Sequence, residues 1–272
     1  MTAIGFAACE GAPRDLGFDQ GRALRDAIRA DLCAIGEAPD RPGLLRRLTG
    51  APPEAALLRD LARHFPHLDE RLAGLADGVG CARAAAAALT VRELAGEVLG
   101  ALARLDPASQ ALELAWPARL GPTGLVVRAA RPDGGYANLT ITRPGLVFAL
   151  AGVNEHGLAG VVQIERPAGP HERCRAPAAL LLDQCLERLD GVEKALEWCE
   201  RRPGGGVARI VLADASGARA AIAIEGETRS RVAAPGEPAK PCDGPRVRVE
   251  CDARAIEVCE AGEVRRFALP AS

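Results

Sequence analysis

The chain is poor in several features that mark particular classes of protein. Its 272 residues include only 1 methionine, 2 tryptophans, 1 tyrosine and 5 phenylalanines, and no basic stripe with interleaved aromatics is visible. The formal net charge is only -2 and the isoelectric point is near 6.2, so the field of the whole protein would not attract nucleic acid or anionic lipid. No apolar run is long enough to span a membrane, and residues 1–10 lack the basic and long apolar regions of a signal peptide. We therefore expect a cytoplasmic protein with neither nucleic acid nor a membrane as its partner.

The sequence also lacks the usual signatures of metal, disulfide and phosphate sites. Its nine cysteines include no C-x-x-C pair and are odd in number, which favours reduced thiols. Cys185 and Cys199 fall on apolar faces of predicted helices, where a free cysteine packs as a small hydrophobe. No two histidines have metal-ligand spacing on a helix, and a pairing of His156 with Ser109 as a catalytic couple is disfavoured. Pro203-Gly-Gly-Gly206 lacks the Lys-Ser/Thr of a phosphate loop, so we expect no cofactor and no metal.

What the chain does have is an apolar content of 48%, enough to bury one substantial core or two small ones. In the N-terminal part of the chain, apolar residues recur with the period of an α-helix. Apolar residues recur with the spacing of an amphipathic helix from Arg14 to Leu32. Further helices are predicted over Pro53 to Phe65, Leu68 to Leu75, and from Ala82 on toward Leu105. We therefore expect a helical N-terminal region over residues 1–108.

Past Asp106 the pattern changes to short strands. Five short apolar or alternating runs, separated by Gly and Pro, predict an antiparallel meander: Ala111 to Trp116, Leu125 to Ala130, Tyr136 to Thr142, Val147 to Gly152 and Leu158 to Ile164. Two helices, a hairpin and three short edge strands follow: Pro177 to Arg188, Val192 to Arg201, Ala208 to Ala213 with Ala218 to Glu225, then Val247 to Cys251, Ala255 to Val258 and Val264 to Leu269. Strands, helices and strands in succession indicate stacked layers over residues 109–272.

The most informative stretch is Ala151 to Gln163, in which an Asn-x-x-Gly-Leu turn joins two apolar runs and Gly157 can supply the positive φ of the turn. Four other patterns accompany this hairpin in a fixed order: Arg14-Asp-Leu-Gly-Phe-Asp-Gln-Gly21, the glycine-containing stretch Leu68 to Gly80, Arg92-Glu93-Leu94, and a helix from Pro177 that leads to Leu212-Ala-Asp-Ala-Ser-Gly217 and Glu225. Over roughly Gly11 to Arg231 the chain thus resembles the acyltransferases and amidohydrolases typified by isopenicillin N acyltransferase (peptidase family C45), among the N-terminal-nucleophile (Ntn) hydrolases.

That resemblance implies an α+β fold, a four-layer αββα Ntn-hydrolase sandwich of antiparallel sheets that follows the helical N-terminal region. It also implies a precursor that cuts itself and frees a cysteine whose own α-amine serves as base, because a thiol near its free pKa is mostly protonated at neutral pH. An oxyanion hole, usually including an asparagine side chain, would hold the tetrahedral intermediate. Such an enzyme acts on linear or cyclic amide bonds, so a small amide or acyl compound is the expected substrate.

The catalytic positions of this chain depart from the family pattern. The nucleophile should fall within Asp106 to Leu114, where there is no cysteine. Ser109 is the nearest match, since serine is the N-terminal nucleophile in relatives outside the family; otherwise it is a turn or cap residue that enters the strand. Where the family has an aspartate after the next strand, this chain has Arg131, of opposite charge. Asp133 would restore the carboxylate after a loop shift, but Pro132-Asp-Gly-Gly135 is also a good turn.

Three further positions complete the candidate site. Gln163 stands where the family commonly has a strand asparagine; it either points an amide donor into a cleft or is solvated at the strand end. Arg209 replaces a polar asparagine and would place a cation in or near the cleft. Asn154, the turn asparagine, is a candidate binding residue whose other role is to satisfy local backbone as an Asx turn.

Two functions follow from this pattern. The first is a degenerate family member that keeps the sandwich, has lost or altered catalysis, and acts as a binding or assembly module with another copy of itself or an active relative. The second is an active amide hydrolase or acyltransferase that uses Ser109 after self-cleavage, with Gln163 as a donor. The loss of cysteine, aspartate and asparagine together favours the first, and the intact scaffold supports the second.

Overall fold

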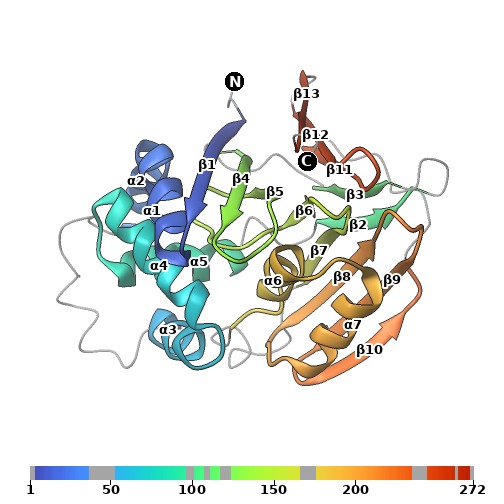
Figure 1. The fold of residues 1–272 in the computed structure, drawn as a ribbon. Helices are drawn as coiled ribbons and strands as arrows, with labels where there is room; N and C mark the ends of the chain where they lie inside the picture. Colours follow the sequence, from blue (N-terminus) through green and yellow to red (C-terminus); the bar gives the residue numbers. More distant parts are fainter. Residues whose placement is uncertain are drawn as a thin grey trace.

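The computed structural model describes residues 4–36, 53–95, 101–106, 111–116, 124–165, 176–234, 244–260 and 263–269. These residues form seven helices and two β-sheets, which confirms the expected mixed α and β class (Figure 1). The helices are α1 (Pro13–Ala23), α2 (Arg25–Ala34), α3 (Pro53–His64), α4 (Pro66–Val79), α5 (Arg83–Ala95), α6 (Leu180–Arg188) and α7 (Val192–Arg201).

The larger sheet has eight strands. In spatial order they are β1 (Gly5–Gly11), β4 (Val126–Pro132), β5 (Asn138–Thr142), β6 (Ala151–Asn154), β7 (Ala159–Glu165), β8 (Val207–Ala213), β9 (Arg219–Glu225) and β10 (Thr228–Val232). All neighbouring strands are antiparallel except β1 and β4, which are parallel. The hairpin of β6 and β7 turns at Gly157, whose φ of 81° is the positive value that the sequence predicts there.

The smaller sheet has five antiparallel strands. In spatial order they are β13 (Glu263–Ala268), β12 (Ala255–Glu260), β11 (Arg246–Glu250), β3 (Leu112–Ala115) and β2 (Leu102–Leu105). The two sheets lie against each other, with β2 and β3 over β7 and β8, and β11 and β12 over β6. Apolar side chains from both inner faces fill the space between the sheets, among them the fully buried Val161, Leu114 and Val247.

Helices cover the other face of the larger sheet. Figure 1 shows α6 and α7 in front of its strands, and α1 beside β1. Close packing of α6 depends on two strand glycines, because a Cβ on Gly160 would come within 2.3 Å of Leu182 and one on Gly152 within 2.6 Å of Leu186. No single helix in the described part is long and apolar enough to cross a membrane; only α4 and α5 pass that test together, and they are bent by 111°.

The two glycine-containing helices of the sequence motifs cross each other at very short distance. A Cβ on Gly17 of α1 would lie 1.9 Å from the carbonyl oxygen of Arg71, and one on Gly74 of α4 would lie 1.9 Å from that of Arg14. Gly21 and Gly78 repeat the relation one turn further on, each with a contact of 2.3 Å. Both motifs are thus explained by one helix crossing in which the two backbones touch.

Several elements differ from the sequence prediction. Two segments inside the region predicted as helical are strands, β1 and β2, and both complete sheets with later parts of the chain. β3 does not belong to the meander; it pairs with β2 and β11 in the smaller sheet. Of the three strands predicted to lie at an edge, β11 and β12 are interior and β13 is at an edge. The amphipathic segment from Arg14 to Leu32 breaks at Leu24 into α1 and α2. Short apolar runs predict strands but not their partners, which explains the errors in the placement of β3, β11 and β12.

Candidate functional site

Asn154 is wholly engaged with the backbone. Its side-chain oxygen accepts hydrogen bonds from the backbone N–H groups of His156 and Leu158, both at 3.0 Å. Its Nδ2 donates to the carbonyls of Leu186 at 3.0 Å and Leu189 at 2.7 Å. The side chain therefore fixes the β6–β7 turn and ties it to the end of α6, and its hydrogen-bonding capacity is used.

Gln163 and Arg209 form a cross-strand pair on β7 and β8. The Gln163 side-chain oxygen accepts a hydrogen bond of 3.2 Å from the backbone N–H of Ala103 on β2, and its Nε2 donates to Glu165 at 3.1 Å. Gln163 lies four residues along β7 from Ala159, which corresponds to about 13 Å. The pair is therefore at the opposite end of the larger sheet from the turn of Asn154.

Ser109 lies outside the described residues, but its flanks are placed. The backbone N–H of Asp106 donates to the carbonyl of Ala111 at 2.9 Å, which joins the ends of β2 and β3. Ala111 lines a small cavity together with Asp214 and Cys251, at the end of the larger sheet where β8 ends. The segment that follows Ser109 thus stands at the Asn154 end of the sheet, whereas Gln163 and Arg209 stand at the other. Among the described site residues, Asn154 therefore lies at one end of the larger sheet, and Gln163 and Arg209 lie at the other.

Arg131 lines a cleft between the two sheets. The cleft has a volume of about 470 Å³ and opens where β1 and β4 of the larger sheet face β13 of the smaller one. Its walls are mostly apolar, with Phe6 and Leu139 on one side and Phe267 and Leu269 on the other. The rings of Phe6 and Phe267 are stacked, with centroids 6.1 Å apart. An apolar cavity of this size with a few polar groups is the usual form of a small-molecule site.

The charged groups of this cleft are adjacent in the sheet. Glu10 of β1 is the register partner of Arg131 on the parallel strand β4. Asp19 also lines the cleft, and its carboxylate accepts a hydrogen bond of 3.3 Å from the backbone N–H of Glu10. Cys9 borders the cleft as well, but burial raises the pKa of its thiol, with Arg128 opposing, so that the thiol remains protonated at neutral pH and is a poor nucleophile.

On the helical face of the larger sheet lies a buried ionic cluster that the sequence reasoning missed, made of Arg71 (α4), Arg128 (β4), Asp183 and Glu187 (α6). Arg71 donates to Asp183 at 2.5 Å and to Glu187, and Arg128 donates to the other oxygen of Asp183. Arg128 also donates to the carbonyl of Val147 at 2.9 Å. Two cations and two carboxylates balance, so the cluster buries no net charge.

The pKa values of the cluster follow from its burial. Burial alone would raise the pKa of Asp183, but Arg128 and Arg71 lower it below its usual value. Burial raises the pKa of Glu187, and the contact with Arg71 opposes this shift incompletely. Burial opposes the charge on Arg71, yet Glu187 and Asp183 together raise its pKa.

A second cavity, of about 370 Å³, borders this cluster and is lined by Arg71, Glu187, His67 and Tyr136. Burial and the neighbouring charges of Arg188 and Arg71 lower the pKa of His67 to about 4. His67 is therefore neutral at pH 7, and its Nε2 lies 2.5 Å from the amide nitrogen of Gln184, which fits Nε2 as the acceptor. Single charged residues inside apolar runs, Arg128 in β4 and Asp183 in α6, were the signal that could have revealed the cluster.

The fold and these sites define an α+β protein with two stacked sheets and an apolar cleft between them. No protein-family model and no curated protein matches the chain. Among solved structures it is similar to a penicillin V acylase from Agrobacterium tumefaciens, with 13% identity and a TM-score of 0.38, over 48% of this chain and 68% of that one. This likeness is too distant to assign the chain to a family.

Proposed function

We propose that this protein is a non-catalytic relative of the C45 acyltransferases and amidohydrolases, and that it binds a small acyl amide in the cleft between its sheets. The observation that carries the proposal is the position of Arg131. The residue that replaces the family's aspartate stands at an apolar cleft, beside a carboxylate. A binding role needs only this cleft, whereas catalysis needs a nucleophile, a base and an oxyanion donor in one place.

The charges at the cleft favour a neutral amide as the polar part of the ligand. Glu10 and Arg131 are neighbours on parallel strands, which lie about 4.8 Å apart. An amide carbonyl accepts a hydrogen bond from the guanidinium, while the amide N–H donates to the carboxylate. A free carboxylate would meet both Glu10 and Asp19, and an ammonium would meet Arg131. The apolar walls around Phe6 and Phe267 then suit the acyl chain.

The loss of catalysis is supported by the engagement of the other candidate residues. The side-chain amide of Asn154 forms hydrogen bonds with four backbone groups. Gln163 contacts Ala103 and Glu165, far from the turn of Asn154. Arg209 is paired with Gln163 in register and shares its end of the sheet. Three expectations from the sequence stay predictions. They are the roles of these residues, the division of the chain into residues 1–108 and 109–272, and assembly with a further subunit.

Binding is tested by calorimetric titration with a medium-chain primary fatty amide such as octanamide. We expect Arg131→Ala and Phe267→Ala to weaken binding about tenfold each, because a charge-assisted hydrogen bond or a buried aromatic contact contributes roughly 1.4 kcal/mol or more. Arg265→Ala is the matched control, since this arginine of β13 is exposed and outside the cleft lining. Absence of binding to the unaltered protein, or equal weakening by all three variants, would contradict the proposal.

The intact mass of the purified protein distinguishes the binding proposal from the alternative, an enzyme that is activated by cleavage before Ser109. Cleavage before Ser109 would give two fragments of 108 and 164 residues, as the 272-residue length requires. We expect a single uncut chain. Two fragments that disappear in Ser109→Ala would replace the binding proposal with amide hydrolysis or acyl transfer.

A further inference from the structure

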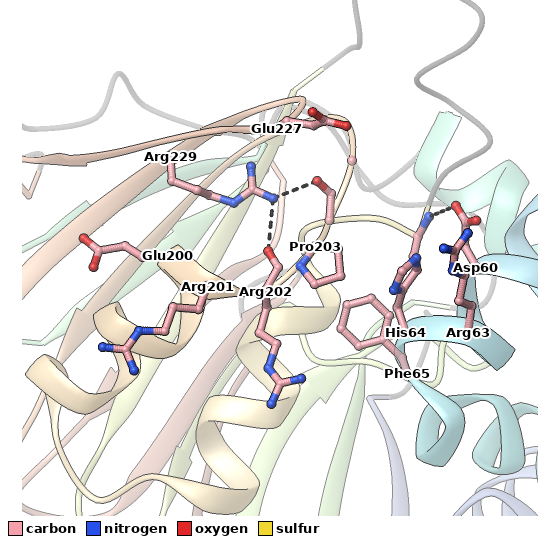
Figure 2. A pocket seen from close by; sticks show the side chains of 13 residues that line it. Asp60, Arg63, His64, Phe65, Glu200, Arg201, Arg202, Pro203, Glu227 and Arg229 are labelled. Atoms are coloured by element: carbon pink, nitrogen blue, oxygen red, sulfur yellow. Dashed lines mark hydrogen bonds between the residues drawn. The ribbon is translucent and has the colours of Figure 1, made fainter.

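A charged hollow lies away from the cleft, between the ends of α3 and α7. It has a volume of about 620 Å³ and is closed by the Pro203-Gly204-Gly205 connector and by Arg229 of β10 (Figure 2). Four arginines line it, Arg63, Arg201, Arg202 and Arg229, together with three acids, Asp60, Glu200 and Glu227. What decides its chemistry is which of these charges already have partners.

The acids are largely engaged. Both oxygens of Glu200 accept from Arg231, at 2.6 Å and 3.2 Å. Asp60 accepts a hydrogen bond of 3.1 Å from the backbone N–H of Ala176, visible as a dashed line in Figure 2. Glu227 also has an interaction partner. Glu200 is therefore paired with an arginine outside the hollow, whereas Asp60 and Glu227 keep their charge and partly compensate the arginines that line it.

Arg229 is a fixed cation at this place. Its two terminal nitrogens donate to four carbonyls, those of Gly226, Thr228, Gly204 and Arg202, at 2.7, 2.9, 2.8 and 3.4 Å. Its Nε is buried and has no hydrogen-bond partner among the described residues. Burial lowers the pKa of Arg229, and the nearby charge of Glu227 opposes this shift only in part. The carbonyls hold the guanidinium in position without neutralising it.

Two more cations stand at the hollow without ion pairs. Within the described ranges, neither Arg63 nor Arg202 has a carboxylate within salt-bridge distance, and Arg202 lies over the ring of Trp198, 3.8 Å from its centroid. Arg201 differs, because it pairs with Glu197 at 3.5 Å and points away from the hollow in Figure 2. Among the described residues, Arg63, Arg202 and Arg229 thus line the hollow without a carboxylate at salt-bridge distance.

We propose that this hollow is a second ligand site, which binds a small molecule carrying a phosphate dianion through Arg63, Arg202 and the fixed charge of Arg229. Guanidinium groups match phosphate oxygens in geometry, and three arginines against the two carboxylates Asp60 and Glu227 leave the hollow with an excess of positive charge. The volume exceeds that of phosphate alone and leaves room for an organic part. Because the residues and the cavity are separate from the cleft of Arg131, this site stands independently of the proposed function.

The probe is inorganic pyrophosphate, titrated into the full chain by calorimetry at fixed ionic strength, with citrate as a carboxylate of comparable charge. We expect pyrophosphate to bind, and both Arg63→Ala and Arg202→Ala to weaken it about tenfold. Arg201→Ala is the matched control and should leave the affinity within about twofold, because its charge is paired outside the hollow. Affinity should also fall with added salt.

Three other outcomes would contradict the proposed phosphate site. No heat with pyrophosphate at millimolar concentration, or equal loss in all three arginine variants, would remove the site. Citrate binding as tightly as pyrophosphate would overturn the phosphate assignment, since the arginines would then recognise charge alone. Circular dichroism of each variant separates a lost site from a lost fold, because all three substituted residues are at the surface.

Discussion

Gly17 of α1 and Gly74 of α4 face each other across the helix crossing so closely that neither position has room for a methyl group, since a Cβ on either would lie 1.9 Å from a carbonyl oxygen of the other helix. The same crossing carries Arg71, whose backbone touches Gly17 and whose side chain enters the buried ionic cluster. The spacing of α1 and α4 therefore also sets the position of a buried charge.

Gly74→Ala tests this crossing. In an exposed helix this change stabilises by roughly 1 kcal/mol, but here the two backbones must separate, and overpacking of this kind costs about 3 kcal/mol. We expect a net loss of stability in urea denaturation. Asp77→Ala, on the exposed side of the same helix, should change stability little, because its ion pair with Arg14 is solvent-exposed. A stable Gly74→Ala protein would mean that the helices pack less closely than described.

Asp183→Asn tests the ionic cluster. Asp183 is 1% exposed and accepts from both Arg71 and Arg128, so its neutral isostere leaves two buried cations with one carboxylate. Breaking a buried pair in this way costs about 3–5 kcal/mol. The measurement is the free energy of unfolding at pH 7. Asp190→Asn, an exposed acid just beyond the same helix, serves as control and should be nearly neutral. Equal effects of the two changes would show that the cluster does not stabilise the fold.

The sequence predicted most helices and hairpins because their periodicity is local. The predicted helix over Val192 to Arg201 coincides with α7, and each strand of the late hairpin differs from the prediction by one residue at its start. The partners of β1 and β3 were not predictable in this way, because pairing joins segments more than a hundred residues apart and short apolar strands fit several sheets.

The candidate site was predicted less well, for a related reason. A family motif fixes residue types along the chain, but whether Arg131 and Gln163 share a pocket depends on the ends of the strands that carry them. Arg131 lines a cleft, whereas Gln163 lies near the end of β7 that is far from the turn of Asn154. The ionic cluster was missed because Arg71, Arg128 and Asp183 are distant in sequence: a single charge inside an apolar run indicates a buried ion, but it does not say which residue is its partner.

Asn154→Ala tests the role of the turn asparagine. The change removes four hydrogen bonds at a buried position and leaves the carbonyls of Leu186 and Leu189 without these donors. At roughly 1 kcal/mol for each bond, we expect a loss of about 2–4 kcal/mol in chemical denaturation. Asn154→Asp should be no better, because a carboxylate oxygen would then face those two carbonyls. If the variants keep full stability but lose octanamide binding, Asn154 is a ligand-binding residue instead.

His67 makes stability depend on pH between about 4 and 6.5. Its pKa is lowered from 6.5 to about 4 in the folded protein, so that within this window the unfolded chain binds a proton that the native state does not. The contribution of His67 is therefore fully present above pH 6.5 and is lost as the pH falls toward 4. We expect His67→Gln, which cannot be protonated, to lose less stability than the unaltered protein when urea denaturation at pH 7 is compared with that at pH 4.5.

Glu187 acts in the opposite direction and provides the control. Because its pKa is raised, the folded state takes up a proton earlier than the unfolded chain as the pH falls, which adds stability toward acid pH and partly masks the effect of His67. Glu187→Gln should therefore steepen the loss between pH 7 and 4.5 while His67→Gln flattens it. If both variants keep the pH profile of the unaltered protein, the cavity beside the ionic cluster is open to water, and neither group is buried as its contacts with Arg71 and Gln184 require.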